Sequence, residues 1–376
     1  MSEWIPRVLI LPSSSYARQR TIGGGERYAL EYARALSRLV PTTLGLFDLT
    51  ETSSRDGSLD IRNYPLNHFS DRWGFPATSD AFKQIGAFDV VHTLCFPTAQ
   101  SEAVVARRRW RRQISVLTDV GGGGRTLSGY LSRISKRLDL HRMADGLAHL
   151  SRYSGSFFSD WSQPQTILYG GAECDPTPAP FTGGHALFVG RLLPHKGILN
   201  VIRALDRETP LRVVGRPYDL DYFAQLQSEA RGKNVTFLTD ASDADIRREY
   251  AAASVVLQPS LPRPTAGGDK SELLGLVALE GMAAGRPVVV TRVTSLPELV
   301  VDGETGFVVP PDDLEALGNR IRELVGNPTL AERMGQQARA HVRQNFTWPA
   351  VAVRGLEFYR ALERRRRGPS STPSGA

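Results

Sequence analysis

Short apolar runs of four to six residues recur along the chain and alternate with amphipathic stretches. This pattern is typical of parallel strands that are buried on both faces and connected by helices. The runs predict strands over 7–11, 42–47, 89–92, 114–118, 146–150 and 166–168, and then over 186–189, 211–214, 235–238, 255–258, 287–290 and 306–309. Helices are expected near 197–206, 219–230, 243–253 and 275–284. The sequence therefore predicts an α/β protein with two doubly wound, Rossmann-like sheets.

A stretch rich in proline and glycine separates the two sets of strands. Residues 173–184 contain three prolines and end in Gly183 and Gly184, so they can continue neither a helix nor a central strand. We expect a first domain over 1–172, a linker over 173–184 and a second domain over 185–345. Ligands of doubly wound sheets bind outside the carboxyl ends of the strands. Two such domains facing each other across a cleft would bind their ligand there.

The composition excludes several classes of protein. A chain of 376 residues that is 41% hydrophobic and 23% charged is neither disordered nor fibrous. The longest early apolar run, Val8–Leu11, is far shorter than the roughly 18 residues of a spanning helix, and the acidic Glu3 precedes it where a signal peptide would be basic. Cys95 and Cys174 allow at most one disulfide and indicate no cysteine-based metal site. We expect a cytoplasmic protein.

The formal net charge of +7 is concentrated in one segment. Residues 101–142 carry ten Lys or Arg and three acidic residues, an excess equal to that of the whole chain. The basic run Arg107–Arg112 and the apolar residues spaced helically over 127–138 are compatible with docking on an anionic membrane, or with an ordinary core stripe. Nucleic acid is not an expected partner, because no recognisable binding module accompanies the charge. Arg364–Arg367 open a tail over 364–376 that is expected to be disordered.

Two glutamates stand out in the segment 271–290. Glu272 and Glu280 are eight positions apart, a little over two helical turns, so a helix would place both carboxylates on one side. Gly275 lies at the expected start of this helix, where free N–H groups can bind a phosphate. One carboxylate would then reach the sugar and the other the ribose of a nucleotide sugar. The alternative is a solvated helix face, which the apolar residues between the glutamates disfavour.

A second cluster follows the strand predicted at 186–189. Arg191 and Lys196 leave the carboxyl end of this strand, where they can converge on a diphosphate and neutralise its charge as it departs. The alternative is a pair of solvated cations in a loop. The combination with the two glutamates favours the first interpretation.

With these motifs the chain resembles the retaining GT-B glycosyltransferases of glycosyltransferase family 4, also called glycosyl transferases group 1. The resemblance rests on residues 188–197, 272–280, 285–288, 296–298 and 302–310. It extends through Phe346 to Trp348, the expected start of a helix over 346–363 that in this fold crosses back to the first domain. The first half matches more loosely, through 23–26, 89–92, Ser151 and 169–171.

The resemblance implies a role for each residue of the two clusters. It assigns Glu272 to the hydroxyls of the transferred sugar and Glu280 to the ribose hydroxyls. Arg191 and Lys196 take the donor diphosphate, and a divalent metal is then not required, because the two cations stabilise the leaving group. No cofactor is implied.

Backbone groups complete the implied donor site. The resemblance assigns the main chain around Gly275 and Leu276 to the diphosphate. Gly24 and Gly25 would let a loop of the first domain approach the phosphates closely. The alternative for these two glycines is a flexible loop that precedes a helix.

Two departures from the family pattern affect the expected site. Many members carry a histidine at the end of a first-domain strand, where this chain has Thr118 and Asp119. Asp119 is the candidate substitute in the catalytic site, and the alternative is that it caps the glycine loop over 121–124. The turn at 214–216 carries Arg216 where the family more often has a Gly–acidic–Gly sequence, so the nucleotide base is not predicted.

Two further residues are candidates for contacts with the acceptor or the sugar. His92 ends a buried strand at the expected cleft edge, and the alternative is a structural histidine. Asp269 lies in the loop that leads into Glu272, where it can hydrogen-bond sugar hydroxyls or belong to a plain surface loop.

The predicted activity is retaining, metal-independent transfer of a hexose or deoxyhexose from a nucleoside diphosphate sugar. The acceptor would be the hydroxyl of a glycan, a lipid-linked sugar or a small molecule, in polysaccharide or glycoconjugate biosynthesis. The alternatives are a GT-B nucleotide-sugar epimerase and a catalytically silent homologue that binds nucleotide sugar. A nicotinamide dehydrogenase is disfavoured, because no Gly-x-Gly-x-x-Gly sequence follows the first strand.

Overall fold

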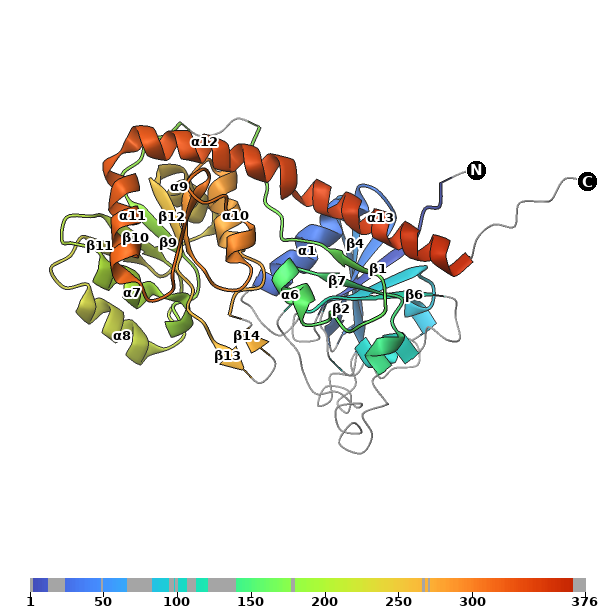
Figure 1. Cartoon of the computed structure of the whole chain (residues 1–376). Coiled ribbons are helices and arrows are strands. Elements are labelled where there is room, and N and C mark those ends of the chain that lie inside the picture. The colour runs from blue at the N-terminus through green and yellow to red at the C-terminus, as the bar shows by residue number, and fades with distance from the viewer. Residues whose placement is uncertain are drawn as a thin grey trace, which may run out of the picture. The chain divides into compact units, whose positions relative to one another are not determined.

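The computed structural model describes residues 3–12, 24–48, 50–65, 83–94, 98, 101–106, 113–120, 140–176, 180–265, 268–269 and 271–367. The chain divides into two compact units, each an α/β domain with a largely parallel sheet (Figure 1). Unit 1 comprises Met1–Tyr169 and Trp348–Ala376, and unit 2 comprises Gly170–Thr347. The predicted fold class, two Rossmann-like domains, is confirmed.

Unit 2 contains a six-stranded parallel sheet in the order β11-β10-β9-β12-β15-β16. Its strands are β9 (Ala186–Val189), β10 (Leu211–Val214), β11 (Val235–Leu238), β12 (Val255–Gln258), β15 (Val288–Thr291) and β16 (Gly306–Val309). Its helices are α7 (Ile198–Ala204), α8 (Leu220–Glu229), α9 (Asp243–Ala252), α10 (Leu276–Ala283), α11 (Leu314–Gly326) and α12 (Pro328–Asn345), with the short helices η3 (Pro194–Lys196) and η4 (Leu296–Glu298). A small hairpin pairs β13 (Pro264–Thr265) with β14 (Gly268–Asp269). Within this sheet, β9 is the first strand in the sequence, and β10 and β11 follow it toward one edge. The next strand, β12, lies on the other side of β9, so the topological switch point lies between β9 and β12.

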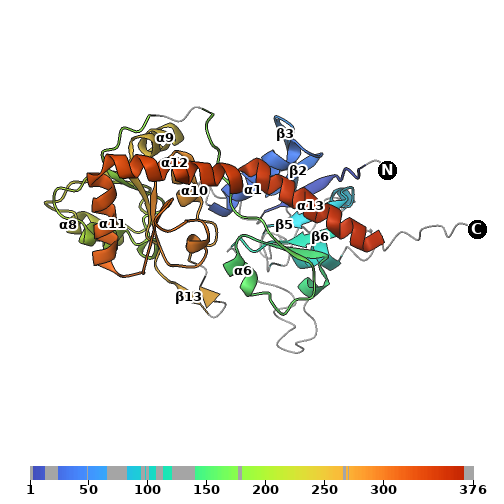
Figure 2. The ribbon, with the colours of Figure 1, turned by 45° about the horizontal axis from the view of Figure 1, so that its top comes forward.

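Helices cover both faces of this sheet. Phe188 and Leu257 belong to a core cluster shared with α7, α8 and α11. The alternate residue Val256 faces the other way, against Gly281 of α10, where an added Cβ would lie 2.8 Å from the Val256 side chain. Figure 2 shows α10 beside α12. The fully apolar strands found in the sequence are therefore central strands buried on both faces.

Unit 1 contains an eight-stranded sheet in the order β3-β4-β2-β1-β5-β6-β7-β8. Its strands are β1 (Val8–Leu11), β2 (Thr42–Asp48), β3 (Thr52–Asp56), β4 (Leu59–Pro65), β5 (Val90–Thr93), β6 (Ile114–Leu117), β7 (Gly146–His149) and β8 (Gln165–Ile167). Helices α1 (Gly24–Ser37), α6 (Arg152–Ser156) and α13 (Trp348–Arg367) and the short helix η2 (Leu140–Met143) accompany the sheet. All pairings are parallel except that of β3 with β4.

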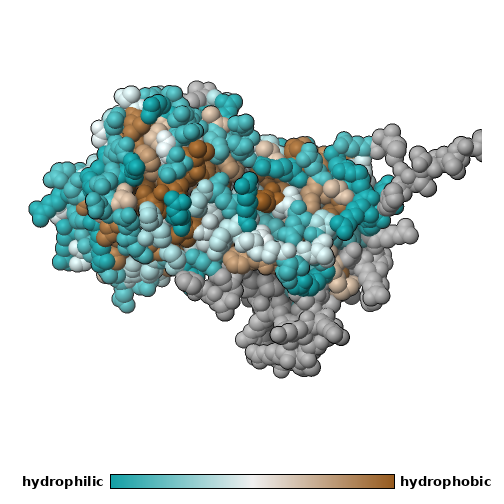
Figure 3. Space-filling model, in the orientation of Figure 1, coloured by the Kyte–Doolittle hydropathy of each residue, from teal (hydrophilic) through white to brown (hydrophobic). Residues whose placement is uncertain are grey.

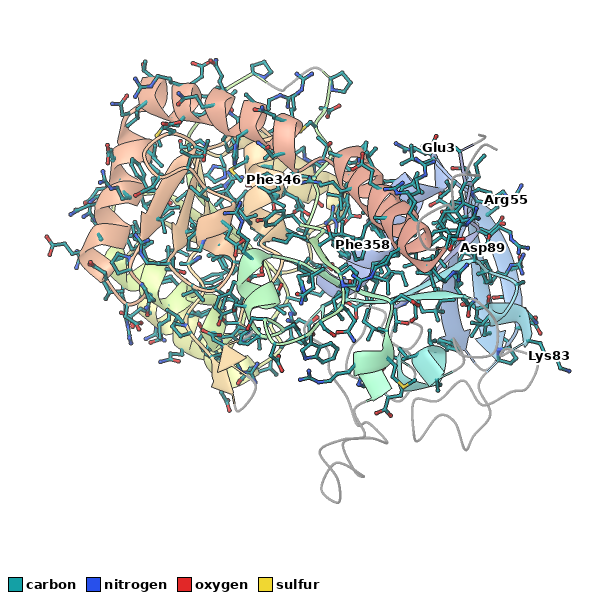
Figure 4. All side chains as sticks on the ribbon, turned by 45° about the vertical axis from the view of Figure 1, so that its right-hand side comes forward. Glu3, Arg55, Lys83, Asp89, Phe346 and Phe358 are labelled. Atoms are coloured by element: carbon teal, nitrogen blue, oxygen red, sulfur yellow. The ribbon has the colours of Figure 1, made fainter. Side chains whose placement is uncertain are left out.

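The helix α13 belongs to unit 1 and packs on α1 and on the sheet. The hydroxyl of Tyr32 on α1 packs directly against Gly355 of α13. An added Cβ at Gly355 would lie 2.0 Å from this hydroxyl oxygen, so a larger residue would clash with it. Phe358, which Figure 4 labels on this helix, fills the space beside Gly146. The helix continues to Arg367, so the expectation that residues 364–367 belong to a disordered tail is wrong. Arg366 and Arg367 extend it because each pairs with Glu363 one turn earlier, at 2.7 and 2.8 Å.

The segment predicted as a linker is part of unit 2, and the boundary falls between Tyr169 and Gly170. Arg286 donates a hydrogen bond of 3.2 Å to the carbonyl oxygen of Pro180, and Arg339 donates to that of Asp175. These two buried guanidinium groups fix the proline-rich stretch to the helices of unit 2. Sequence composition showed that the stretch is irregular, but not that buried arginines hold it in place.

None of the helices in the described part of the chain is both long and apolar enough to cross a membrane. The face shown in Figure 3 is largely hydrophilic over the described residues, with separate apolar patches. The basic run Arg107–Arg112 and residues 121–139 lie outside the described residues, as does Cys95. The predicted contact with an anionic membrane therefore stays a prediction.

Candidate functional site

The loops that follow β9 and β12 meet at the switch point of unit 2. The main-chain N–H of Leu261, after β12, donates a hydrogen bond of 2.8 Å to the carbonyl oxygen of His195, after β9. Gly197 ends the first loop with a φ of 73°, and an added Cβ there would lie 1.9 Å from the carbonyl oxygen of Pro259. Only glycine allows this close approach, which holds Lys196 at the carboxyl end of the sheet.

Gly197→Ala is expected to destabilise unit 2 and to lower activity, because it combines left-handed backbone strain with a clash against Pro259. Gly232 provides the matched control, since it has the same φ of 73° but no atom within 4 Å of an added Cβ. We expect Gly197→Ala to lose about 2 kcal/mol more than Gly232→Ala in the free energy of unfolding. Urea unfolding of both variants measures the difference. Equal losses of unfolding free energy in the two variants would mean that backbone strain alone causes the loss. The loops after β9 and β12 would then separate without a measurable cost.

A partly buried ion pair joins the two loops. The Nζ of Lys196 lies 2.7 Å from the Oε2 of Glu272, and the side chains are only 18% and 11% exposed. The Ser260 hydroxyl donates to the same oxygen at 3.3 Å, and the N–H of Gly275 donates to Oε1 at 3.4 Å. Thr294 and Ser295 donate to the main-chain carbonyl of Glu272 and fix its backbone.

These contacts decide the charge of Glu272. Burial raises the pKa of its carboxyl, but the ammonium of Lys196 and hydrogen bonds from Gln258 and Gly275 outweigh burial and hold the pKa below its ordinary value. The carboxylate is therefore ionised at neutral pH and paired with Lys196. Glu272 is therefore an anion with a fixed orientation at the carboxyl end of the sheet of unit 2.

Helix α10 begins directly beside this pair. Gly275, at φ 59°, precedes the helix, and an added Cβ would lie 2.3 Å from the Leu299 side chain. The N–H of Ala278 donates to the Oε1 of Gln258 at 2.9 Å. The N–H groups of Leu276 and Val277 have no hydrogen-bond partner among the residues that the structure describes. They are available to an anion at the helix N-terminus, where the helix dipole favours negative charge.

The two motif glutamates come from different elements. Glu280 lies on α10, whereas Glu272 lies in the loop before it, so the expectation that one helix carries both carboxylates is wrong. The left-handed conformation at Gly275 turns the chain into the helix and separates them. The Oε2 of Glu280 accepts a hydrogen bond of 2.9 Å from the Tyr250 hydroxyl on α9.

Positive charge exceeds negative charge around Lys196. The pKa of His195 is lowered to about 4 by burial and then by Lys196, Arg263 and Arg191, while Glu272 acts in the opposite direction. These four charged groups are therefore close enough to act on one imidazole. The Arg191 side chain is exposed, with its guanidinium carbon 5.8 Å from the centre of the Tyr218 ring. The three cations outnumber the single carboxylate of Glu272, so the local potential is positive and favours an anionic ligand.

The glycine and aspartate candidates in unit 1 lie at the N-terminus of α1 and just after β6. Gly24 and Gly25 form the first turn of α1, and an added Cβ at Gly25 would lie 3.4 Å from the Val120 side chain. Val120 follows Asp119, whose side chain is buried after β6. The negative charge of Asp119 acts to raise the pKa of His149, although burial lowers that pKa overall. The structure thus brings the glycine turn and the Asp119 loop together.

His92 is a structural residue, and its predicted contact with an acceptor is wrong. The side chain is fully buried, and both ring nitrogens are used, Nδ1 with Tyr359 and Nε2 with Thr118, each at 2.7 Å. Burial lowers its pKa to about 3, so the ring is neutral. The sequence placed His92 at the end of a strand but could not show that α13 covers it.

Asp269 organises its own loop. Its Oδ1 accepts hydrogen bonds from the N–H of Arg263 at 3.2 Å and from the N–H of Ser271 at 2.9 Å. This supports the alternative given above, a structural carboxylate of the loop, over a direct contact with the sugar. Among the described residues no group of three or more His, Cys, Asp or Glu side chains is placed to hold a metal ion.

Sequence reasoning missed several residues that build the site. Gln258 and Ser260 fix α10 and Glu272, and both lie at the carboxyl end of β12, next to the switch point. Their position after a central strand is a signal that could have found them. Tyr250 and Thr294 carry no such signal, because their contacts depend on how helices and loops pack.

The fold and the site together define a class. Two Rossmann-like units, with a cationic loop and a helix N-terminus at the switch point of the second, form a GT-B architecture. Residues 179–341 match the family model of glycosyl transferases group 1. The second unit of the chain is therefore similar to the group 1 glycosyltransferases.

Several relatives and solved structures are similar to this chain. A glycogen synthase of Mycobacterium tuberculosis is 28% identical over 301 residues, which cover 75% of this chain and 70% of that protein. A GDP-mannose-dependent alpha-(1-6)-phosphatidylinositol monomannoside mannosyltransferase of Mycolicibacterium smegmatis is 27% identical over 93% of this chain and 97% of its own length.

Among solved structures, sucrose-phosphate synthase of Thermosynechococcus elongatus has a TM-score of 0.71 at 22% identity, over 95% of this chain and 99% of that one. Anabaena HepE in complex with UDP has a TM-score of 0.71 at 19% identity, over 94% and 100%. These structures share the GT-B fold.

Proposed function

We propose that this glycosyltransferase moves a hexose or deoxyhexose from a nucleoside diphosphate sugar to an acceptor hydroxyl, with retention at the anomeric carbon. One observation carries the proposal: an ionised Glu272, held by Lys196 and Ser260, lies beside the N-terminus of α10. A carboxylate that is already oriented can accept hydrogen bonds from sugar hydroxyls, and the adjacent cations and N–H groups can bind the diphosphate.

The cations after β9 are also proposed to stabilise the leaving diphosphate. As the bond between the sugar and the phosphate breaks, negative charge grows on the leaving diphosphate. Arg191 and Lys196 stabilise this charge, so the proposed reaction uses no divalent metal and no cofactor. Asp119, at the end of β6, is the proposed substitute for the first-domain histidine that positions the sugar. Gly24 and Gly25, in the turn beside it, are proposed to approach the donor phosphates.

The relatives support the donor class. The mannosyltransferase of M. smegmatis depends on GDP-mannose by name, and HepE was solved with UDP and with UDP-glucose. For the acceptor we propose a glycan, a lipid-linked sugar or a small molecule in polysaccharide or glycoconjugate biosynthesis. The name of the mannosyltransferase includes a phosphatidylinositol lipid, which supports the lipid-linked case.

The proposed location is the cytoplasm, with the basic segment 107–112 against an anionic membrane face. The local charge excess of residues 101–142 supports this proposal.

The full-length protein and a panel of nucleoside diphosphates and nucleoside diphosphate sugars test this function. We expect the matching donor to raise the unfolding temperature, because a ligand at about 100 times its dissociation constant stabilises by about 2.7 kcal/mol. NMR of the stabilising donor then follows its fate with and without sugar acceptors. Fast conversion of the donor alone would indicate an epimerase, and binding without any turnover would indicate a silent homologue. Transfer only in the presence of an acceptor is the expected result.

A further inference from the structure

The carboxylate of Glu280 is held by a residue of the neighbouring helix. The hydroxyl of Tyr250 on α9 donates a hydrogen bond of 2.9 Å to the Oε2 of Glu280 on α10. Tyr250 is only 6% exposed, so its ring is fixed by packing and the hydroxyl has little freedom to move away. A glutamate side chain otherwise has several rotamers available and loses that freedom when it binds a ligand.

A buried arginine fixes the end of the helix that carries Tyr250. Arg286 follows α10 and is 1% exposed. Its Nε donates to the carbonyl oxygen of Tyr250 at 3.1 Å, and its Nη2 donates to that of Ala251 at 2.6 Å. These carbonyls belong to the last turn of α9, which a cation stabilises through both hydrogen bonds and the helix dipole. The guanidinium also stacks on Phe181, with 4.8 Å from its central carbon to the ring centre.

The contacts form one continuous support for Glu280. Arg286 holds the main chain of Tyr250, and the side chain of Tyr250 holds Glu280. Arg286 also joins the end of α10 itself, because its N–H donates to the carbonyl oxygen of Gly281 at 3.0 Å. Arg286 therefore joins the C-terminal end of α9 to the C-terminal end of α10, close to the contact between Tyr250 and Glu280.

We propose that Tyr250 is a positioning residue that sets Glu280 for the ribose hydroxyls of the donor, and that Arg286 maintains Tyr250 in place. The inference rests on the proposed function, in which Glu280 binds ribose. A carboxylate whose orientation is set before binding loses less conformational entropy when the nucleotide arrives, which strengthens binding without any direct contact between Tyr250 and the ligand. The effect should be specific for ligands with ribose hydroxyls.

Calorimetric titration of the full-length protein tests this specificity with two probes, UDP or GDP, whichever binds, and its 2′,3′-dideoxy analogue. Tyr250→Phe removes only the hydroxyl. We expect it to weaken the ribonucleotide about threefold to tenfold and to leave the dideoxy analogue within about twofold. In a Glu280→Gln background the same substitution should add little further loss. The matched control is Tyr222→Phe, a buried tyrosine of α8 on the other face of the sheet, which should change neither affinity.

Each other outcome overturns a defined part of the account. If wild type discriminates the two nucleotides but Tyr250→Phe weakens both equally, Tyr250 acts on general stability and the inference is wrong. If wild type binds both equally, Glu280 does not bind ribose, and the proposed site assignment fails together with the inference. Arg286→Lys should show the same selective loss for the ribonucleotide. A loss of thermal stability with unchanged discrimination would remove Arg286 from the proposal.

Discussion

Glu272→Gln is expected to lower the rate of sugar transfer on the order of tenfold to a hundredfold, with nucleoside diphosphate affinity changed by less than about threefold. The amide has nearly the shape of the carboxylate but carries no charge. It can neither pair with Lys196 as an anion nor accept strong hydrogen bonds from sugar hydroxyls with both oxygens. The nucleotide brings its own negative charge to Lys196, so its binding is spared.

Initial rates with the full donor and calorimetry with the free nucleotide separate the two effects for Glu272→Gln. The control is Glu208→Gln, an exposed carboxylate in the loop before β10, at the opposite end of the sheet. It should leave both quantities unchanged. A Glu272→Gln enzyme with a near-native rate would contradict the assignment of Glu272 to the transferred sugar.

Lys196→Met is expected to cost about 3 kcal/mol of folding free energy near neutral pH, because it leaves the carboxylate of Glu272 buried without its ammonium partner. The loss should depend on pH. In wild type the pKa of Glu272 is lowered, so its contribution to stability is present above the ordinary carboxyl range and is lost as the pH falls through the folded-state pKa. In the variant the ammonium is absent, and burial, the largest single effect on this carboxyl, raises its pKa against the hydrogen bonds that remain. The gap between the two proteins should therefore narrow toward about pH 4.

Urea unfolding at about pH 7 and about pH 4 measures this gap for Lys196→Met. Lys233→Met is the matched control, since the Lys233 ammonium donates to the carbonyl oxygens of Ile202 and Leu205 and to no carboxylate in the described structure. The loss of folding free energy in Lys233→Met should be the same at both pH values. A Lys196→Met loss that stays constant over this range would show that Glu272 is not the partner that matters.

Much of the fold follows directly from the apolar runs. All predicted strands are observed within one residue of their expected ends, because a central parallel strand buried on both faces has a distinctive composition. The edge hairpin β3–β4 was missed, since its strands are polar and partly exposed. The two-residue turn Gly57–Ser58, with Gly57 at a φ of 58°, is a hairpin signal in the sequence.

The sequence predicted which loops meet at the switch point of unit 2, but not the geometry of their contacts. Lys196 and Glu272 come together as the switch point requires, but their direct ion pair depends on Gly197 and Gly275, whose backbone angles the sequence does not state. His92 resembled a site residue because it ends a strand, and only the packing of Tyr359 shows that it is enclosed. Long-range contacts of this kind depend on tertiary packing and leave no periodic pattern in the sequence.

The central claim is that Glu280, with the cations after β9, binds the nucleotide part of the donor and that Glu272 binds the sugar part. Calorimetry of one nucleoside diphosphate with wild type, Glu280→Gln and Glu272→Gln tests it most directly. The account predicts that Glu280→Gln weakens the nucleotide on the order of tenfold to a hundredfold and that Glu272→Gln binds it almost as wild type does. Equal affinity in all three proteins, or a larger loss in Glu272→Gln, would contradict the claim.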